Sequence, residues 1–273
     1  MRRLSGVAVA LVAVLGTSAV SAGTAASAAP AGVQPWTQIS PSTAIAGQSA
    51  GLLRTSDGRL HVVWASHDGT AGYSLHYSTL GKTALLSTAA IVHGWRSVSF
   101  YPRLVPTASG GIRMIFTGAD GVSASPYDNS AMYSATSGKA GQTWALATGS
   151  MSQTTLLPAT DTAAAAETDG TPVAGWKSGA SFAYHAGLDS TSPATAPDQS
   201  VSAGTGAVVV GPAMVRDSHG GIWAGWFDNS FAASQGYYVV RILPTLTKLL
   251  RAPKSGGANI GNNQPLESVA LAA

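Results

Sequence analysis

Hydrophobic positions along this chain fall in short runs between glycine-rich turns, and the runs recur. Four segments align without gaps, and each begins with a polar residue and glycine and reaches an aromatic residue seven positions later. They are 57–64 (DGRLHVVW), 109–116 (SGGIRMIF), 169–176 (DGTPVAGW) and 219–226 (HGGIWAGW), and their starts are 52, 60 and 50 residues apart. Glycine at the second position suits a tight turn that needs a positive φ. Self-similarity at such a period indicates a repeat architecture.

Strand signals flank each of these turns. The strands expected before the turns are 51–54, 103–106, 163–166 and 213–216, and the strands expected after the aromatic residues are 73–79, 130–136, 181–187 and 236–242. Their β-branched and aromatic residues favour strands, and no stretch beyond residue 29 has a helical stripe of apolar residues. Antiparallel strands in units of this length predict the blades of a β-propeller. An immunoglobulin-like sandwich is the alternative, but it does not predict an in-register repeat. The Ala-, Ser-, Thr- and Pro-rich segment 190–202 predicts an exposed connection between blades.

The expected fold class is therefore all-β, a propeller with four blades and the start of a fifth. Residues 268–273 (SVALAA) match residues 49–54 (SAGLLR) at the innermost strand of the first unit. Four and a fraction blades would leave an open ring with an unpaired strand edge. We therefore expect a single domain, residues 30–273, truncated at its C-terminus from a six-bladed propeller. A small ring closed by residues 36–39 (WTQI) is the alternative.

The first 29 residues predict a signal peptide. Arg2 and Arg3 precede an apolar run at 7–15 (VAVALVAVL), and small residues allow cleavage after Ala28 or, as a second candidate, after Ala22. The apolar run is too short for a membrane span, which needs roughly 20 residues. We therefore expect a secreted protein with no membrane contact after cleavage.

Composition removes several classes of function. The 15 Lys and Arg residues include Arg2 and Arg3, so the mature chain carries 13 against 12 Asp and Glu and has no basic run. A nucleic-acid groove needs a basic patch, so no nucleic-acid partner is expected. The absence of cysteine excludes disulfides and thiol chemistry. The six histidines lack the spacing of a zinc site, so we expect no metal and no cofactor. We also expect a monomer.

One segment carries a resemblance to a known family. Residues 137–144 (SGKAGQTW), shortly after 132–134 (MYS), resemble the Asp-box (BNR repeat) of sialidase-like β-propellers, Ser-x-Asp-x-Gly-x-Thr-Trp, with Lys139 in place of the Asp. The resemblance implies a structural turn between the third and fourth strands of a blade, with Trp144 packed between blades. It implies the fold and not the activity. In an active member it would further imply a Tyr nucleophile beside a Glu, an Asp acid and three arginines that clamp a carboxylate.

Candidate ligand residues cluster in the loops between the second and third strands, which leave the edge opposite the glycine turns. Propellers usually place binding sites at that edge, around the central channel. Carboxylates, amides and aromatic rings that converge there suit a hydroxyl-rich ligand such as a sugar. The alternative is that the Asp-Asn pairs cap turns. The candidates are His67, Asp68, Asp120, Tyr127, Asp128, Asn129, Lys177, Asp228 and Asn229.

Arg103 is a further candidate. It takes the place of Gly51, Ala163 and Ala213 in the other units, on the strand nearest the channel. There it could bind an anionic ligand or fill the seam between blades beside a carboxylate. Only two glutamates are present: Glu167 lies before a glycine turn, on the other edge, and Glu267 lies near the C-terminal residue.

These observations favour a secreted, non-catalytic propeller that binds a carbohydrate or a cell-surface polymer. Two alternatives stay open. The first is an exo-glycosidase of sialidase type, a glycoside hydrolase, whose missing carboxylates lie in further C-terminal blades. The second is a structural propeller that docks another protein.

Overall fold

The fold is all-β, as the sequence predicts. The computed structural model describes residues 50–67, 72–81, 85–98, 101–119, 131–138, 143–147, 151, 160–187, 199–202, 209–230, 235–247 and 249–253, and these ranges hold strands and no helix. The expected fifth strand at 268–273, the closing segment at 36–39 and the signal peptide lie outside the described residues. No helix in these ranges is long and apolar enough to cross a membrane.

The strands form four antiparallel sheets in a propeller arrangement, one sheet to each repeat. Blade 1 holds β1 (Gly51–Arg54), β2 (Leu60–His67), β3 (Tyr73–Leu80) and β4 (Leu85–Trp95). Blade 2 holds β5 (Ser97–Val98), β6 (Arg103–Pro106), β7 (Ile112–Ala119), β8 (Ala131–Ser137) and β9 (Trp144–Leu146), with β5 and β6 both paired to β7. Blade 3 holds β10 (Thr160–Ala166), β11 (Pro172–Ser178), β12 (Ser181–Ala186) and β13 (Gln199–Ser202). Blade 4 holds β14 (Val209–Arg216), β15 (Ile222–Asp228), β16 (Gly236–Leu243) and β17 (Leu250–Pro253).

The four repeated glycines make the same turn in every blade. Gly58, Gly110, Gly170 and Gly220 have φ values of 83°, 75°, 84° and 85°. Each donates its N–H to the carbonyl three residues earlier, at 2.9–3.1 Å. An L-residue with a side chain rarely adopts this φ, so the turn explains why glycine recurs. The strand alignment inferred from the repeat is confirmed.

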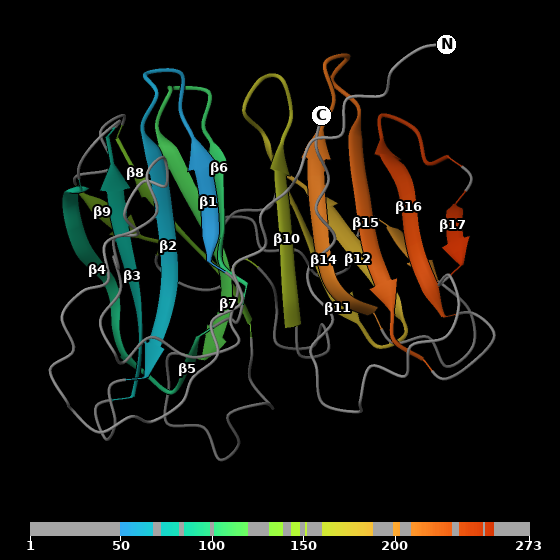
Figure 1. Cartoon of the computed structure of the whole chain (residues 1–273), viewed down its shortest axis with the longest axis horizontal. Coiled ribbons are helices and arrows are strands. Elements are labelled where there is room, and N and C mark those ends of the chain that lie inside the picture. The colour runs from blue at the N-terminus through green and yellow to red at the C-terminus, as the bar shows by residue number, and fades with distance from the viewer. Residues whose placement is uncertain are drawn as a thin grey trace, which may run out of the picture. The chain divides into compact units, whose positions relative to one another are not determined.

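The turns and the opposite loops lie on two different edges of the sheets. In Figure 1 the hairpins β1–β2, β6–β7, β10–β11 and β14–β15 all lie along the upper edge. We call this the turn edge. The ends of β2, β7, β11 and β15 lie on the lower, opposite edge, which is where the loops to the third strands begin. The separation of the two edges, expected from the repeat, is therefore observed.

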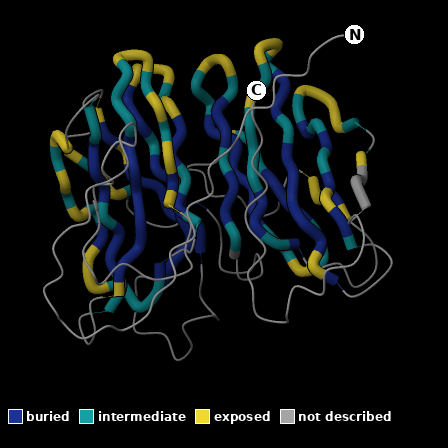
Figure 2. The backbone as a smooth tube through the Cα atoms, viewed as in Figure 1, coloured by how far each residue is buried: buried dark blue, intermediate teal, exposed yellow. Residues whose placement is uncertain are grey.

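The hydrophobic core lies in the seams between consecutive blades. The buried backbone in Figure 2 follows the inner strands, and the buried side chains form one cluster for each of the three seams. The repeated aromatic residue belongs to the seam with the preceding blade: Phe116 at blades 1 and 2, Trp176 at blades 2 and 3, and Trp226 at blades 3 and 4. All three are at most 1% exposed. Trp226 stacks on Phe182 across its seam, with centroids 5.4 Å apart.

Two expectations about outer strands have different outcomes. Trp144 packs edge-on against Tyr77 of blade 1, with centroids 5.0 Å apart, which is the packing between blades that was expected for it. The prediction that residues 190–202 are only a connection is wrong, because Gln199–Ser202 form β13. This strand pairs with the free edge of β12, and its Val201 is buried in the seam core.

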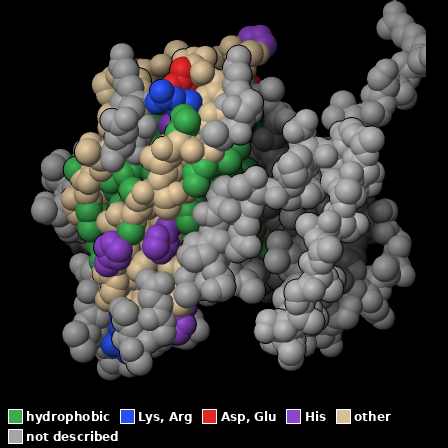
Figure 3. Space-filling model, turned by 60° about the vertical axis from the view of Figure 1, so that its left-hand side comes forward, with side chains coloured by type: hydrophobic (Ala, Val, Ile, Leu, Met, Phe, Trp, Pro, Cys, Tyr) green, Lys and Arg blue, Asp and Glu red, His purple; other side chains and the backbone are tan. Residues whose placement is uncertain are grey.

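Few of the described side chains on the face brought forward in Figure 3 are charged. Hydrophobic side chains lie there among backbone atoms and uncharged polar side chains. Leu85 and Leu86 of β4 are 45% and 54% exposed. This agrees with the low charged fraction of the sequence, 10%.

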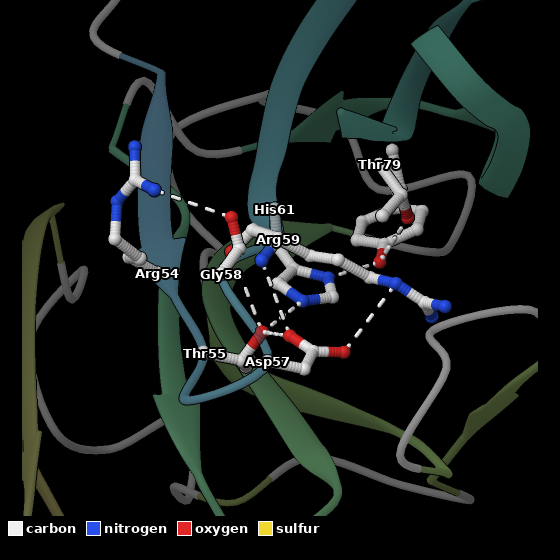
Figure 4. A network of polar contacts seen from close by, with 8 residues as sticks. Arg54, Thr55, Asp57, Gly58, Arg59, His61 and Thr79 are labelled. Atoms are coloured by element: carbon white, nitrogen blue, oxygen red, sulfur yellow. Dashed lines mark hydrogen bonds and ion pairs between the residues drawn. The ribbon is translucent and has the colours of Figure 1, made fainter. Parts of the chain in front are cut away.

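A chain of hydrogen bonds lies beneath the first turn (Figure 4). Thr79 donates to the Tyr77 hydroxyl, which contacts Nδ1 of the fully buried His61. His61 Nε2 lies 2.9 Å from the Thr55 hydroxyl, which donates to Asp57 at 2.6 Å. Because Tyr77 accepts from Thr79, its own proton is available to Nδ1, and Nε2–H then donates to Thr55. This order uses a neutral imidazole with one donor and one acceptor nitrogen.

We expect blade 1 to lose stability in mild acid because of His61. Burial lowers the pKa of His61 below 6.5. The nearby carboxylate of Asp57 raises this pKa, and the cation Arg59 lowers it. The contribution of neutral His61 is therefore complete above about pH 6.5 and is lost as the pH falls through that value toward the lower pKa of the folded state. Thermal unfolding between about pH 7.5 and 5 measures the effect. His61→Gln should flatten this pH dependence, and exposed His219→Gln should not. Equal slopes for wild type and His61→Gln would contradict the assignment.

Candidate functional site

The inner strands of blades 3 and 4 carry the same irregularity near the edge opposite the turns. The register between β10 and β11 shifts between Thr160 and Ala163, and the register between β14 and β15 shifts between Val210 and Ala213. Asp161 and Gly211 therefore occupy matching positions, and their φ values are 53° and 55°. A glycine adopts this conformation freely, whereas Asp is one of the few other residues that tolerate it. The bulge therefore sets a carboxyl group where the next blade has no side chain.

Arg103 links three blades beside this bulge. Its Nε donates to the Thr162 carbonyl of blade 3 at 2.9 Å, and its Nη2 donates to the Pro212 carbonyl of blade 4 at 3.0 Å. Both carbonyls belong to the bulged segments. The guanidinium carbon also lies 5.8 Å from the ring centroid of Tyr101. Of the two roles expected for Arg103, these contacts match the seam role, with backbone carbonyls in place of the expected carboxylate.

Acidic and basic side chains near the bulge change one another's pKa values. Burial raises the pKa of the Asp161 carboxyl, and the cations Lys177 and Arg103 lower it. Burial lowers the pKa of Arg103, and Tyr101 and Asp161 raise it. Burial also raises the pKa of Tyr101, with Asp161 acting in the same direction, so its hydroxyl keeps its proton. We call Tyr101, Arg103, Asp161 and Lys177 the bulge cluster.

The bulge cluster offers several groups that can bind a polar ligand. Lys177 supplies an ammonium donor near the end of β11, and Tyr101 supplies a hydroxyl and an aromatic face. Asp161 accepts hydrogen bonds when ionised and donates one when protonated. The buried hydroxyl of Thr162, next to Asp161, has no hydrogen-bond partner in the described part of the chain. Within the same ranges no group of His, Asp and Glu could hold a metal ion.

The other candidates from the sequence either have contacts of their own or lie outside the described residues. His67 ends β2 on the same edge, is exposed, and rests on Tyr73 at 4.6 Å between ring centroids. Asp228 is fully buried and accepts hydrogen bonds from the N–H and hydroxyl of Ser230, each at 2.9 Å. That geometry is the turn-capping alternative, while its neighbour Asn229 is exposed. Asp68, Asp120, Tyr127, Asp128 and Asn129 lie outside the described residues.

Two members of the cluster were not among the sequence candidates. Asp161 and Tyr101 both lie two residues before the aligned inner strand, in the place taken by Ser49 and Gly211 in the other units. When the repeat alignment is extended two residues upstream, Asp161 is the one carboxylate among the four units at this position. Glu167 lies on the turn edge, as expected, where its carbonyl accepts from Gly170 and Arg216.

Comparisons with known proteins give the fold. No family model matches this chain, and no curated protein matches it. An exo-β-1,3-galactanase from Clostridium thermocellum is similar in structure at 11% identity, with a TM-score of 0.53 over 74% of this chain and 47% of that one. A protein of unknown function from Dyadobacter fermentans gives 11% identity and a TM-score of 0.55 over 75% of this chain and 68% of that one. A Hadza microbial sialidase gives 14% identity and a TM-score of 0.49 over 74% and 45%.

This chain therefore spans about half the length of the galactanase. Identities this low show architecture alone. The expected propeller fold is confirmed at that level.

Proposed function

We propose that this propeller binds a carbohydrate at the bulge cluster, as an exported protein that meets its ligand outside the cell. The observation that carries the proposal is Asp161, which holds a left-handed backbone conformation and a partly buried carboxyl group at a place where blade 4 has glycine. Unfavourable backbone conformations persist at sites where function requires them. A carboxyl, an ammonium and a tyrosine together match the hydroxyl groups and apolar faces of a sugar. The name of the galactanase assigns a saccharide to one protein of this fold.

Asp161→Asn should weaken saccharide binding about tenfold, because the amide loses one acceptor and the charge of a partly buried site. Asn tolerates the same φ, so the fold should be retained. A panel of neutral and acidic oligosaccharides on an array, followed by calorimetry on the best ligand, measures the effect. Asp169→Asn is the matched control, because Asp169 belongs to the same blade but lies on the turn edge. The proposal fails if wild type binds no saccharide or if Asp161→Asn binds as tightly as wild type.

The raised pKa of Asp161 favours a second candidate, glycoside hydrolysis with Asp161 as the general acid. A catalytic acid must hold a proton near the working pH, and burial moves this carboxyl in that direction. Turnover of fluorogenic glycosides, lost in Asp161→Asn and kept in Asp169→Asn, would support the hydrolase. Binding without turnover would support the non-catalytic protein.

A further inference from the structure

A pocket lies on the turn edge of blade 2, whereas the bulge cluster lies near the opposite edge. It is open to solvent and has a volume of about 560 Å³, within the range of small-ligand sites. The β6–β7 turn contributes Thr107 and Ser109, β7 contributes Arg113, and the ends of β8 and β9 contribute Ser137 and Trp144. The pocket therefore spans the strand ends of one blade.

Two residues that line this pocket, Ser137 and Trp144, each carry a buried polar atom with no partner in the described part of the chain. The Ser137 side chain is 8% exposed, and its Oγ makes no hydrogen bond there. The indole Nε1 of Trp144 is also buried and unpaired. An unpaired buried polar group destabilises the folded chain, and a bound ligand that supplied acceptors would satisfy it. By contrast Thr107 is already engaged, because its Oγ1 accepts from Gly111 N–H at 2.9 Å and lies 3.0 Å from Ser109 Oγ.

The available groups of the pocket are mainly donors. An indole nitrogen only donates, a guanidinium carries five donors and no acceptor, and a hydroxyl can donate. Arg113 has no ion pair to another residue that the structure describes. Among the described residues that line the pocket, Arg113 is the one cation and none is a carboxylate. A group with several anionic oxygens meets all of these donors at once.

We propose that this pocket is a second binding site, for a ligand that carries a carboxylate, phosphate or sulfate group. Arg113 pairs with the anion, and Ser137 and Trp144 donate to its oxygens. The site is independent of the bulge cluster, and either site can be present without the other.

The test is titration of the full chain with glucuronate, glucose 6-phosphate and inorganic sulfate, with glucose as the uncharged control. Calorimetry gives the affinity, and the indole N–H resonance that disappears in Trp144→Phe reports the site. We expect saturable binding of at least one anion and binding of glucose at least about tenfold weaker. The three anions distinguish a carboxylate site from a phosphate or sulfate site.

Variants separate this site from a merely structural pocket. Arg113→Gln should lower the affinity for the anion at least about tenfold. Ser137→Ala should lower the affinity while its melting temperature stays equal or rises, because the removed hydroxyl is unpaired without ligand. Lys177→Gln and Asp161→Asn, in the bulge cluster, should leave anion binding unchanged. No saturable binding of any of the three anions, equal binding of glucose, or wild-type affinity in Arg113→Gln would each overturn the proposal.

Discussion

Gly170→Ala is expected to lower the free energy of unfolding by about 3 kcal/mol, because two costs add at this position. The residue has φ +84°, which an L-residue adopts at a cost of about 1–2 kcal/mol. A Cβ atom there would also lie 2.2 Å from the backbone nitrogen of Ala108 in blade 2. The backbone of Ala108 cannot rotate away as the end of a flexible side chain can, so the turns of the two blades must move apart. This movement should cost about 1–3 kcal/mol.

Gly58→Ala is the matched control for this prediction. Gly58 has φ +83° in the same kind of turn, and nothing lies within 4 Å of its added Cβ. This variant should lose only the conformational part, about 1–2 kcal/mol. Urea unfolding of both variants measures the difference. Equal losses would mean that the contact between the turns of blades 2 and 3 contributes nothing to stability.

Arg103→Met should lower the free energy of unfolding by about 2–3 kcal/mol. The change removes two hydrogen bonds from a cation, each worth about 1.5–3 kcal/mol, and part of that loss is offset because the guanidinium no longer has to leave water. The carbonyls of Thr162 and Pro212 then lose the donor that joins blades 2, 3 and 4. Equilibrium unfolding in urea is the measurement.

Two further substitutions make the Arg103 result specific. Arg54→Met removes an exposed arginine that donates a 3.2 Å hydrogen bond to the Gly58 carbonyl, and should change stability by less than about 0.5 kcal/mol. Arg103→Lys should fall between wild type and Arg103→Met, because a lysine keeps the charge but not the forked donor geometry. A loss in Arg103→Met no larger than in Arg54→Met would show that the tie between blades is unimportant.

The repeat was predictable because it rests on local rules. Gly58 and its three counterparts recur because the turn needs a positive φ. In blades 2, 3 and 4 the aromatic residue seven positions on recurs because it fills the seam with the preceding blade. β13 was missed because only one of its four residues, Val201, is buried, so polar residues are allowed at the other three positions.

The candidate site was predicted only in part. Arg103 stood out in the alignment, and Lys177 was among the loop candidates, but Asp161 was not. The position of the Asp161 carboxyl depends on a bulge that shifts the register between Thr160 and Ala163, and no residue type in the sequence predicts that bulge. The pocket of Arg113, Ser137 and Trp144 was likewise invisible, because unpaired atoms can be recognised only once every neighbour is placed.

By itself, the sequence determined the three inner strands of each blade, the turns, the number of repeats in residues 50–253 and the edge on which each loop emerges. These follow from the alternation of side chains, the φ preference of glycine and the period of the repeat, all of which act within a few residues of the chain. Only the tertiary structure decided the partners of Arg103, because the two carbonyls that it binds lie 59 and 109 residues away. The positions of these carbonyls depend on how three blades pack, and that packing brings together groups that no local pattern connects.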